Sequence, residues 1–298
     1  MEQLMQLLTA AGIAYKENEP LAAHCTFKIG GPARLFVQPV DRAQLCRAVA
    51  LCKAQSVRYY LLGNGSNILF ADEGYNGAVL DISSMQDAVE VHGTQLTAVA
   101  GVRLSALCKT ALEHGLTGLE FAYGIPGTVG GAVYMNAGAY GGEMKDVLTT
   151  VQYLTAEGEV KESAAAELDL RYRHSIFEEN GGCILSAQFA LTPGEPEAIR
   201  AKMDELMAKR LDKQPLDKPS AGSTFKRPLG AFAAALIDQC GLRGYRHGGA
   251  AVSEKHCGFV VNLGGATCAD VLALCEEVRA IVKEKTGYDL EKEIRVVR

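Results

Sequence analysis

Hydrophobic and polar positions change period along the chain, and the changes mark the expected elements. Apolar residues recur at helical spacing, or fall between helix start and stop signals, in segments typical of helices: residues 1–20, 41–54, 104–114, 231–240 and 268–285. Apolar residues alternate or cluster in short runs typical of strands at residues 34–37, 57–62, 67–70, 88–91, 96–100, 147–154, 183–191, 258–262 and 293–297. This interleaving predicts an α+β protein.

A change of composition at residues 192–198, TPGEPEA, predicts a domain boundary. Pro193 and Pro196 punctuate the run, which passes from a strand-like segment into a helix reaching about residue 209. We therefore expect a first region over 1–193, made of lobes at about 1–84 and 85–193 with the second lobe beginning near Asp87. A second domain is expected over 194–298.

Composition narrows the class of protein. With 298 residues and 48% hydrophobic residues, the chain can bury substantial cores. The net charge of −5 gives no general attraction to nucleic acid or to an anionic membrane. Nine cysteines without a CxxC pair indicate reduced, packing thiols of a cytoplasmic protein, and six histidines without HxxxH or HExxH spacing predict no metal site. No export leader and no apolar run of membrane-spanning length is evident, so we expect a soluble protein.

Two glycine-rich segments suggest a phosphate-binding site. They are GNGSN at residues 63–67 and GIPGTVGG at 124–131, which continues to MNAGA at 135–139. Glycine allows positive φ and close backbone approach, so consecutive N–H groups can surround a pyrophosphate. The first segment lacks the third glycine of a dinucleotide fingerprint and leads into a strand, and no GxxxxGK[ST] sequence is present. Either segment alone could serve a tight turn, but together they favour a pyrophosphate.

Five motifs together resemble the UDP-N-acetylenolpyruvoylglucosamine reductase family. They are TFKIGGPA at 26–33, GNGSN at 63–67, GIPGTVGGAVYMNAGA at 124–139, YRHSIF at 172–177 and AGSTFKRP at 221–228. The resemblance implies a two-lobed FAD-binding domain of the vanillyl-alcohol oxidase type, with FAD held non-covalently, and a C-terminal α+β substrate domain. Only residues 178–182 separate Phe177 from the next strand, which is similar to the branch that lacks a tyrosine-bearing insertion.

The implied activity is an NADPH-dependent, FAD-mediated reduction of the enolpyruvyl ether of UDP-N-acetylglucosamine to UDP-N-acetylmuramate in peptidoglycan synthesis. NADPH rather than NADH follows from the resemblance alone, because no pocket for a 2′-phosphate is evident in the loops. We also expect a monomer. Two alternatives stay open: another FAD-dependent oxidoreductase on the same scaffold, such as an alcohol or lactone oxidase, and a flavin-binding protein without turnover.

Three catalytic residues follow from matching the motifs. Arg173 would hold the enolate through its planar guanidinium, and Ser223 would donate the proton after hydride transfer from flavin N5. Glu293 would polarise the substrate carboxylate or enolate. From the bare sequence, Ser223 could equally be a turn hydroxyl. Lys292 and Ile294 stand where the family has proline and valine, which weakens the match at Glu293. The three side chains are expected to converge at the N5 edge of the flavin.

The remaining predicted site residues divide into two sets. The cofactor set comprises Gly63, Asn64, Gly65, Ser66, Asn67, Gly124, Ile125, Pro126, Gly127, Thr128, Gly130, Gly131, Asn136, Gly138 and Ala139. A basic cluster predicts an anion site for the substrate diphosphate, with Lys213 the best match to the family's phosphate-binding lysine: Lys209, Arg210, Lys213, Lys218, Lys226 and Arg227. From this cluster, Lys213, Lys226 and Arg227 form the predicted substrate-binding set, and Lys226 or Arg227 could relieve an alkoxide at Ser223.

Overall fold

The computed structural model describes residues 1–85 and 89–298, which form two compact units. Unit 1 comprises residues 1–16, 35–64 and 77–210, and unit 2 comprises residues 17–34, 65–76 and 211–298. The expected start of the second lobe near Asp87, and Ala88 of the strand expected at 88–91, lie outside the described residues. The chain passes repeatedly between the units, so neither is one continuous stretch of sequence.

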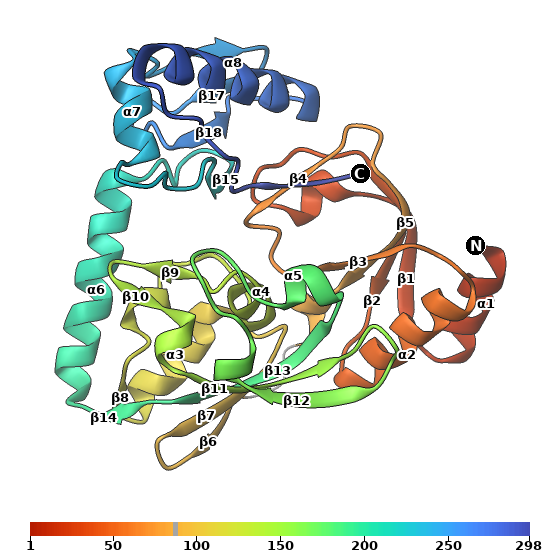
Figure 1. Ribbon diagram of the computed structural model, residues 1–298. Coiled ribbons are helices and arrows are strands. Elements are labelled where there is room, and N and C mark those ends of the chain that lie inside the picture. The colour runs from red at the N-terminus through yellow and green to blue at the C-terminus, as the bar shows by residue number, and fades with distance from the viewer. Residues whose placement is uncertain (86–88) are drawn as a thin grey trace. The chain divides into compact units, whose positions relative to one another are not determined.

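A five-stranded antiparallel sheet forms the main layer of unit 1 (Figure 1). In spatial order its strands are β12 (Val160–Ala164), β11 (Leu148–Leu154), β13 (Cys183–Ala190), β7 (Gln95–Val99) and β6 (Glu90–His92). Strand β13, with the sequence CILSAQFA, is buried at six of its eight positions, as expected for a central strand covered on both faces. Helix α4 (Val129–Tyr134) packs on β13.

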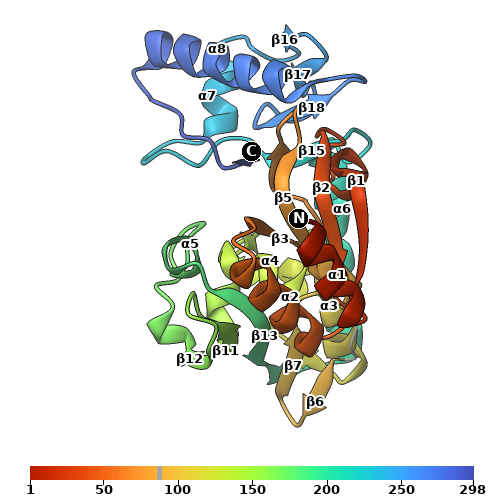
Figure 2. The ribbon, with the colours of Figure 1, turned by 90° about the vertical axis from the view of Figure 1, so that its right-hand side faces the viewer.

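A four-stranded sheet runs in the order β1-β2-β5-β3 and gives residues 14–16, 35–38, 59–62 and 77–81 to unit 1. Its strands are β1 (Ala14–Pro20), β2 (Pro32–Gln38), β5 (Tyr75–Asp81) and β3 (Tyr59–Leu62), with β3 parallel to β5. Helices α1 (Glu2–Ala10) and α2 (Arg42–Ala54) lie side by side (Figure 2). Helix α2 begins where Asp41 Oδ1 accepts a 2.7 Å bond from the Gln44 N–H, a capping bond of about 1 kcal/mol.

Shorter elements complete unit 1. They are η2 (Ile82–Ser84), α3 (Leu104–Glu113), β8 (Leu116–Thr117), η3 (Glu120–Ala122), β9 (Gly138–Ala139), β10 (Gly142–Glu143), η4 (Met144–Asp146), η5 (Ala165–Glu167), α5 (Phe177–Asn180) and β14 (Thr192–Pro193). Helix α6 (Pro196–Lys213) belongs to unit 1 through residue 210, because Ile199 and Met203 are part of its hydrophobic core. Along α6, unit 1 passes into unit 2 after residue 210, and the domain boundary expected at 192–198 stays a prediction.

Unit 2 contains an antiparallel sheet in the order β15-β18-β17-β16. The strands are β15 (Ser220–Ser223), β18 (Phe259–Asn262), β17 (Ala250–Val252) and β16 (Arg246–His247), accompanied by α7 (Ala233–Gln239), α8 (Cys268–Thr286) and η1 (Leu21–His24). Helix α8 starts at a capping box between Thr267 and Asp270 and ends at Gly287 in the left-handed conformation. Strands β4 (Ile68–Phe70) and β19 (Arg295–Val297) pair in parallel.

The predicted α+β class is confirmed, and two local predictions are wrong. The helix expected over residues 1–20 ends at Ala10, because Gly12 turns the chain at φ +66° and residues 14–20 form β1. The glycine-rich segment expected as a loop contains α4, which Thr128 caps by accepting a 3.4 Å bond from the Gly131 N–H. Glycine lowers helix propensity, but burial of α4 against the main sheet outweighs that cost.

All nine cysteines are free thiols, eight of them buried and Cys46 half-buried. Burial raises the pKa of Cys52 and Cys268 to about 11, so these thiols remain protonated at neutral pH. The prediction that the cysteines serve packing is confirmed. In the part of the chain that the structure describes, no helix is long and apolar enough to cross a membrane.

Candidate functional site

The two glycine-rich segments meet in unit 1 at Asn64. The Asn64 side-chain amide donates a 2.7 Å hydrogen bond to the Pro126 carbonyl. A Cβ added to Gly63 would lie 2.5 Å from Thr128 Oγ1, so any larger residue would displace the cap of α4. The sequence placed these segments 57 residues apart or more, and the fold brings residues 63–64 against residues 126–128.

Close packing explains two of the glycines in residues 124–139, whereas a third glycine faces open space. A Cβ on Gly130 would lie 2.8 Å from Ala100 Cβ, and one on Gly138 would lie 2.6 Å from the Gly142 carbonyl oxygen. These two glycines are required by close contacts inside unit 1. Gly131 is different, because it is exposed and a Cβ there would meet nothing closer than Thr128 Oγ1 at 3.5 Å. The backbone around Gly131 is therefore the part of the segment that a ligand can approach.

Asn136 is a structural residue of this segment. It is fully buried at φ +38°, and its amide donates to Glu143 Oε2 at 3.1 Å and to the Arg171 carbonyl at 3.0 Å. Its Oδ1 accepts from the Lys145 N–H at 2.9 Å. Both amide hydrogens are thus used within unit 1. The prediction that Asn136 contacts the cofactor stays a prediction.

Arg173 lies at the tip of a tight turn in unit 1. Arg171 and His174 exchange backbone hydrogen bonds of 3.2 and 3.1 Å, which leaves Tyr172 and Arg173 as the two turn residues, with Arg173 at φ +54°. The guanidinium lies 5.0 Å from the centre of the Tyr172 ring and donates a 3.3 Å bond to the Gly138 carbonyl. Arg173 is therefore fixed beside the glycine-rich segment.

The rest of the YRHSIF motif anchors this turn. The fully buried Ser175 donates a 2.7 Å bond to the Tyr134 carbonyl at the end of α4. Phe177 packs edge-on against Tyr153 of β11, with ring centres 5.0 Å apart. His174 contacts Asp169 and Glu178 at 3.2 and 3.3 Å. The motif thus consists of an exposed tip followed by anchors in the core.

Positive charge is concentrated next to Arg173. Lys145, which pairs with Glu143 at 2.7 Å, is the main cause that lowers the pKa of Glu143, and Asn136 and Arg173 add smaller effects. Glu143 consequently stays ionised in mildly acidic solution. Its negative charge balances part of the cationic field at the turn.

In unit 2, Thr26 connects the loop at residues 65–67 to strand β15. The Thr26 N–H donates to the Gly65 carbonyl at 3.1 Å, and Thr26 Oγ1 donates to the Ser220 carbonyl at 2.6 Å. Gly65 has φ +60°, and a Cβ there would lie 2.5 Å from the His24 carbonyl oxygen, so this position requires glycine. The motif TFKIGGPA therefore positions two predicted site segments, a role that the sequence did not reveal for Thr26.

Ser223 and Glu293 lie on adjacent segments of unit 2. The Glu293 N–H donates to the Thr224 carbonyl at 2.8 Å, and the Lys226 N–H donates to the Glu291 carbonyl at 2.8 Å. Asn67 also joins this arrangement. Its side-chain amide donates to the Glu293 backbone carbonyl at 3.2 Å, and its own backbone carbonyl accepts from the Arg295 N–H at 3.0 Å. Two predicted catalytic residues and one predicted cofactor residue are thus brought together in one unit. Arg173 belongs to unit 1, and the convergence of all three catalytic residues stays a prediction.

The predicted substrate-binding residues of unit 2 have different surroundings. Lys213 is exposed at the end of α6. Lys226 pairs with Glu291 at 2.6 Å, and the Arg227 guanidinium lies 4.6 Å from the centre of the Phe232 ring. Lys213 and Arg227 are both exposed, whereas Lys226 is half-buried and a ligand would compete with Glu291 for it.

The loop at residues 65–67 has the donors that a phosphate needs. Within the residues that the structure describes, the N–H groups of Gly65 and Ser66 donate to no protein acceptor, and Gly65 has a left-handed backbone. Consecutive free N–H groups in such a turn form an anion-binding concavity. The N–H groups of Gly65 and Ser66 fit a phosphate of a diphosphate-containing cofactor such as FAD.

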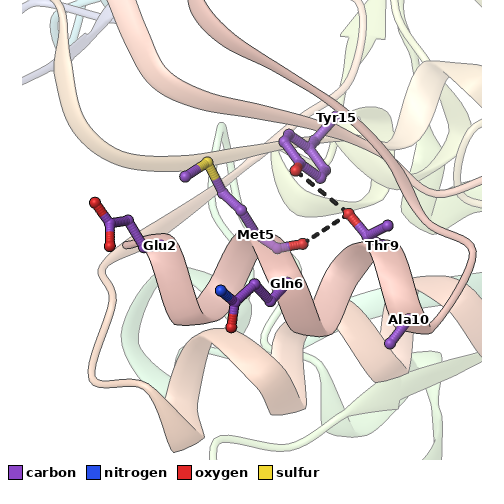
Figure 3. Close-up of a pocket in the computed structure, with 6 residues that line it drawn as sticks. All are labelled: Glu2, Met5, Gln6, Thr9, Ala10 and Tyr15. Carbon is purple, nitrogen blue, oxygen red and sulfur yellow. Dashed lines mark hydrogen bonds between the residues drawn. The ribbon is translucent and has the colours of Figure 1, made fainter.

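A surface pocket of about 510 Å³ lies elsewhere, on the outer side of α1 (Figure 3). Its six lining residues are Glu2, Met5, Gln6, Thr9, Ala10 and Tyr15. Thr9 donates to the Met5 carbonyl at 3.0 Å, and its hydroxyl lies 3.3 Å from that of Tyr15. Because the pocket is lined by one carboxylate and otherwise neutral groups, it offers no redox or anion-binding chemistry.

Comparison with known proteins extends over both units. Residues 33–164 match the FAD binding domain family, and residues 214–297 match the C-terminal domain family of UDP-N-acetylenolpyruvoylglucosamine reductase. The chain is 48% identical to the Agathobacter rectalis protein of that name over 308 residues, covering 99% of this chain and 96% of the relative. It is 45% identical to the Clostridioides difficile protein over 294 residues, again covering 99% and 96%.

A solved structure gives the same result. The crystal structure of the Thermus caldophilus UDP-N-acetylenolpyruvylglucosamine reductase matches with a TM-score of 0.80 and 34% sequence identity. The match covers 96% of this chain and 99% of that chain. Sequence identity and structural similarity to these reductases therefore both extend over nearly the whole chain.

Proposed function

Since the chain belongs to the UDP-N-acetylenolpyruvoylglucosamine reductase family, we propose that it reduces UDP-N-acetylglucosamine enolpyruvate to UDP-N-acetylmuramate in peptidoglycan synthesis, using FAD and NADPH. The observation that carries this proposal is the 44–49% identity to curated relatives with that activity in their names, extending over 94–100% of the chain. The family matches also cover both the flavin-binding part and the C-terminal domain.

Bound FAD would supply the hydride-transfer chemistry that links NADPH to the enolpyruvyl group. The residues that would hold it are Gly65 and Ser66 in unit 2, through their backbone N–H groups, and Gly131 in unit 1, where the exposed backbone has no side chain that would block a close approach. No covalent attachment is needed for this mode of binding.

The chain's own side chains would manage the charge and the proton. Arg173, fixed at its turn, holds the substrate carboxylate and the negative charge that develops beside it. Ser223 donates the proton to the carbanion carbon, which is a stronger base than an alkoxide. The backbone bond from Glu293 to Thr224 keeps the Glu293 segment beside the Ser223 strand, where a protonated Glu293 can share the enolate charge.

The remaining parts of the proposal concern the setting of the enzyme. The diphosphate of the substrate would be bound by Lys213 and by Lys226 and Arg227, which follow the end of β15 in the chain. Nine free thiols suit a reducing compartment, so we place the enzyme in the cytoplasm, and we expect it to act as a monomer without a nucleic-acid partner. Light scattering of the purified protein checks the oligomeric state.

Stopped-flow absorbance tests the activity. The oxidised enzyme is mixed with NADPH, and the reduced enzyme is then mixed without oxygen with the enolpyruvyl UDP-sugar. The reductase reaction predicts fast bleaching of the flavin band followed by fast recovery that depends on the UDP-sugar. Recovery in air alone at the same rate would indicate an oxidase, and failure of NADPH to bleach the flavin would indicate a binding protein without turnover.

A further inference from the structure

Arg210 is a half-buried cation of unit 1 whose Nε has no hydrogen-bond partner among the described residues. It lies on α6, its side chain is half-buried, and its Nε is buried without a hydrogen-bond acceptor. Within the described residues, no carboxylate or carbonyl accepts a hydrogen bond from the Arg210 guanidinium. Burial lowers the pKa of Arg210, an effect that nearby Tyr140 partly opposes. An arginine remains charged even so, and a charge kept from water without a partner destabilises the protein.

The stem of this arginine is held against the glycine-rich segment. A Cβ added to Gly124 would lie 3.0 Å from Arg210 Cδ and 3.4 Å from Met207 Sδ. A larger residue at position 124 would crowd the arginine stem, which would have to shift by a few tenths of an ångström. Because the stem and Nε are enclosed, the terminal nitrogens have a fixed position beside the first glycine of residues 124–131. A preorganised guanidinium loses little conformational entropy when it binds an anion.

The neighbouring cations of α6 differ from Arg210 because they are exposed to solvent. Lys202 pairs with Glu205 at 2.9 Å, and Lys209 also pairs with Glu205. Both lysines are exposed, as is Arg200. Arg210 therefore differs from these exposed basic residues of its helix in having a buried Nε without a hydrogen-bond acceptor. A structural ion pair does not account for it.

We propose that Arg210 binds a phosphate group, with its terminal nitrogens donating to the oxygens of a diphosphate ester that lies over the segment at Gly124. This inference rests on the proposed function, because that function requires diphosphate esters, among them FAD and the UDP-sugar. Guanidinium groups donate paired hydrogen bonds to phosphate oxygens, and such charge-assisted bonds are strong where water is excluded. The same contact would remove the cost of the enclosed charge.

Three variants of the full-length chain test the role of Arg210. Arg210→Met keeps an unbranched stem over Gly124 but removes the charge, and Arg210→Lys keeps the charge without the planar fork. Arg200→Met is the matched control on the same helix. Dissociation constants of FAD, and of riboflavin as a ligand without phosphate, are measured by flavin fluorescence on flavin-free protein. Binding of UDP to the flavin-loaded protein is measured by calorimetry.

Loss of the phosphate contact should weaken binding of one diphosphate ligand about 10- to 100-fold in Arg210→Met, with a smaller loss in Arg210→Lys. A loss confined to FAD, with riboflavin unchanged, assigns the contact to the cofactor, whereas a loss confined to UDP assigns it to the substrate. The thermal midpoint of the flavin-free Arg210→Met protein should not fall, because a buried unpartnered Nε is removed. This midpoint separates ligand binding from a structural role.

Arg210→Met affinities equal to those of Arg200→Met for both FAD and UDP would overturn the inference. So would a lower thermal midpoint that Arg210→Lys restores while affinities stay unchanged, because Arg210 would then be structural. Failure of the proposed function has a different signature: the wild-type chain itself would not bind FAD or would not be reoxidised by the enolpyruvyl substrate. A wild-type reductase with an indifferent Arg210 removes only this inference.

Discussion

Two regions of the molecule carry the predicted catalytic side chains, and they position them by different means. In unit 1, Arg173 lies on a turn whose flank is fixed by the buried side chains of Ser175 and Phe177. In unit 2, Ser223 and Glu293 are placed mainly by backbone bonds between their segments. The position of Arg173 therefore depends on the identity of neighbouring side chains, whereas the positions of Ser223 and Glu293 depend mainly on backbone pairing.

This difference explains why a departure from the family pattern at Lys292 is compatible with the site. Phe225 and Lys292 face each other in an isolated antiparallel β-bridge. The two backbone hydrogen bonds of this bridge are donated by the N–H groups of Lys226 and Glu293. The bond that positions Glu293 is therefore made by Glu293 itself. Lys292 adds an ion pair to Glu276 at 2.6 Å, which the family's proline could not make. The departure changes the surroundings of Glu293 but keeps the backbone bond that places it.

The largest effect is expected for Ser223→Ala, which removes the predicted proton donor without disturbing backbone bonds. Flavin reduction by NADPH should stay at the wild-type rate, and reoxidation by the enolpyruvyl substrate should slow by about 10²- to 10⁴-fold. Stopped-flow absorbance measures both half-reactions. Ser220→Ala on the same strand is the control and should be normal in both. Equal reoxidation rates in Ser223→Ala and Ser220→Ala would remove Ser223 from the mechanism.

A smaller effect is expected for Arg173→Lys, which keeps the charge at the turn but loses the planar guanidinium. Reoxidation by substrate should slow by about 10²-fold, because a lysine cannot hold two oxygens in the same geometry. Arg171→Lys on the same turn, where the arginine pairs with exposed Asp169, should react normally. If the two variants behave alike, Arg173 does not contact the reacting substrate.

The comparison between the regions is tested most directly by Ser175→Ala. Loss of the bond to the Tyr134 carbonyl should lower the free energy of unfolding by about 1 kcal/mol and reduce kcat/KM several-fold, because the Arg173 turn loses its anchor. Urea unfolding and steady-state rates measure the two effects. Ser84→Ala, which removes bonds to the Pro39 and Asp81 carbonyls, should lose similar stability with normal kcat/KM.

The counterpart in unit 2 is Thr26→Val, which removes the 2.6 Å bond to Ser220. Backbone pairing should still hold Ser223 in place, so kcat/KM should change less than in Ser175→Ala despite a similar loss of stability. Thr26→Ser should behave as wild type because it keeps the hydroxyl. A larger loss of activity in Thr26→Val than in Ser175→Ala would contradict the distinction between the regions.

The smallest effect concerns the charge next to Arg173. Pairing with Lys145 lowers the pKa of Glu143 below its ordinary value of 4.5, so the stability gained from this pairing is present above pH 4.5 and is lost as the pH falls through the folded-state pKa. NMR titration should place the Glu143 midpoint below 4.5 in the wild type and closer to 4.5 in Lys145→Met. An identical midpoint in both proteins would contradict the assigned cause.

Local sequence patterns determined most of the elements and the family. Helices such as α2 and α8 carry their own start signals, Asp41 and Thr267, and alternating or continuous apolar runs identified the strands. The opening segment shows the limit of periodicity, because α1 and β1 share an apolar pattern that only the turn at Gly12 divides.

Tertiary structure alone decided which residues support the predicted ones. Thr26 and Ser220 are 194 positions apart, and Asn67 and Glu293 are 226 apart, so no local pattern predicts their hydrogen bonds. In the sequence, Arg210 is one member of a basic cluster, and only the fold shows that its stem packs against Gly124 and that its Nε is buried without a hydrogen-bond partner among the described residues. Propensity and periodicity act between near neighbours, whereas burial and long-range hydrogen bonds arise only when distant segments pack. The sequence therefore supplied the predicted reacting groups, and the fold identified the residues that hold their segments in place.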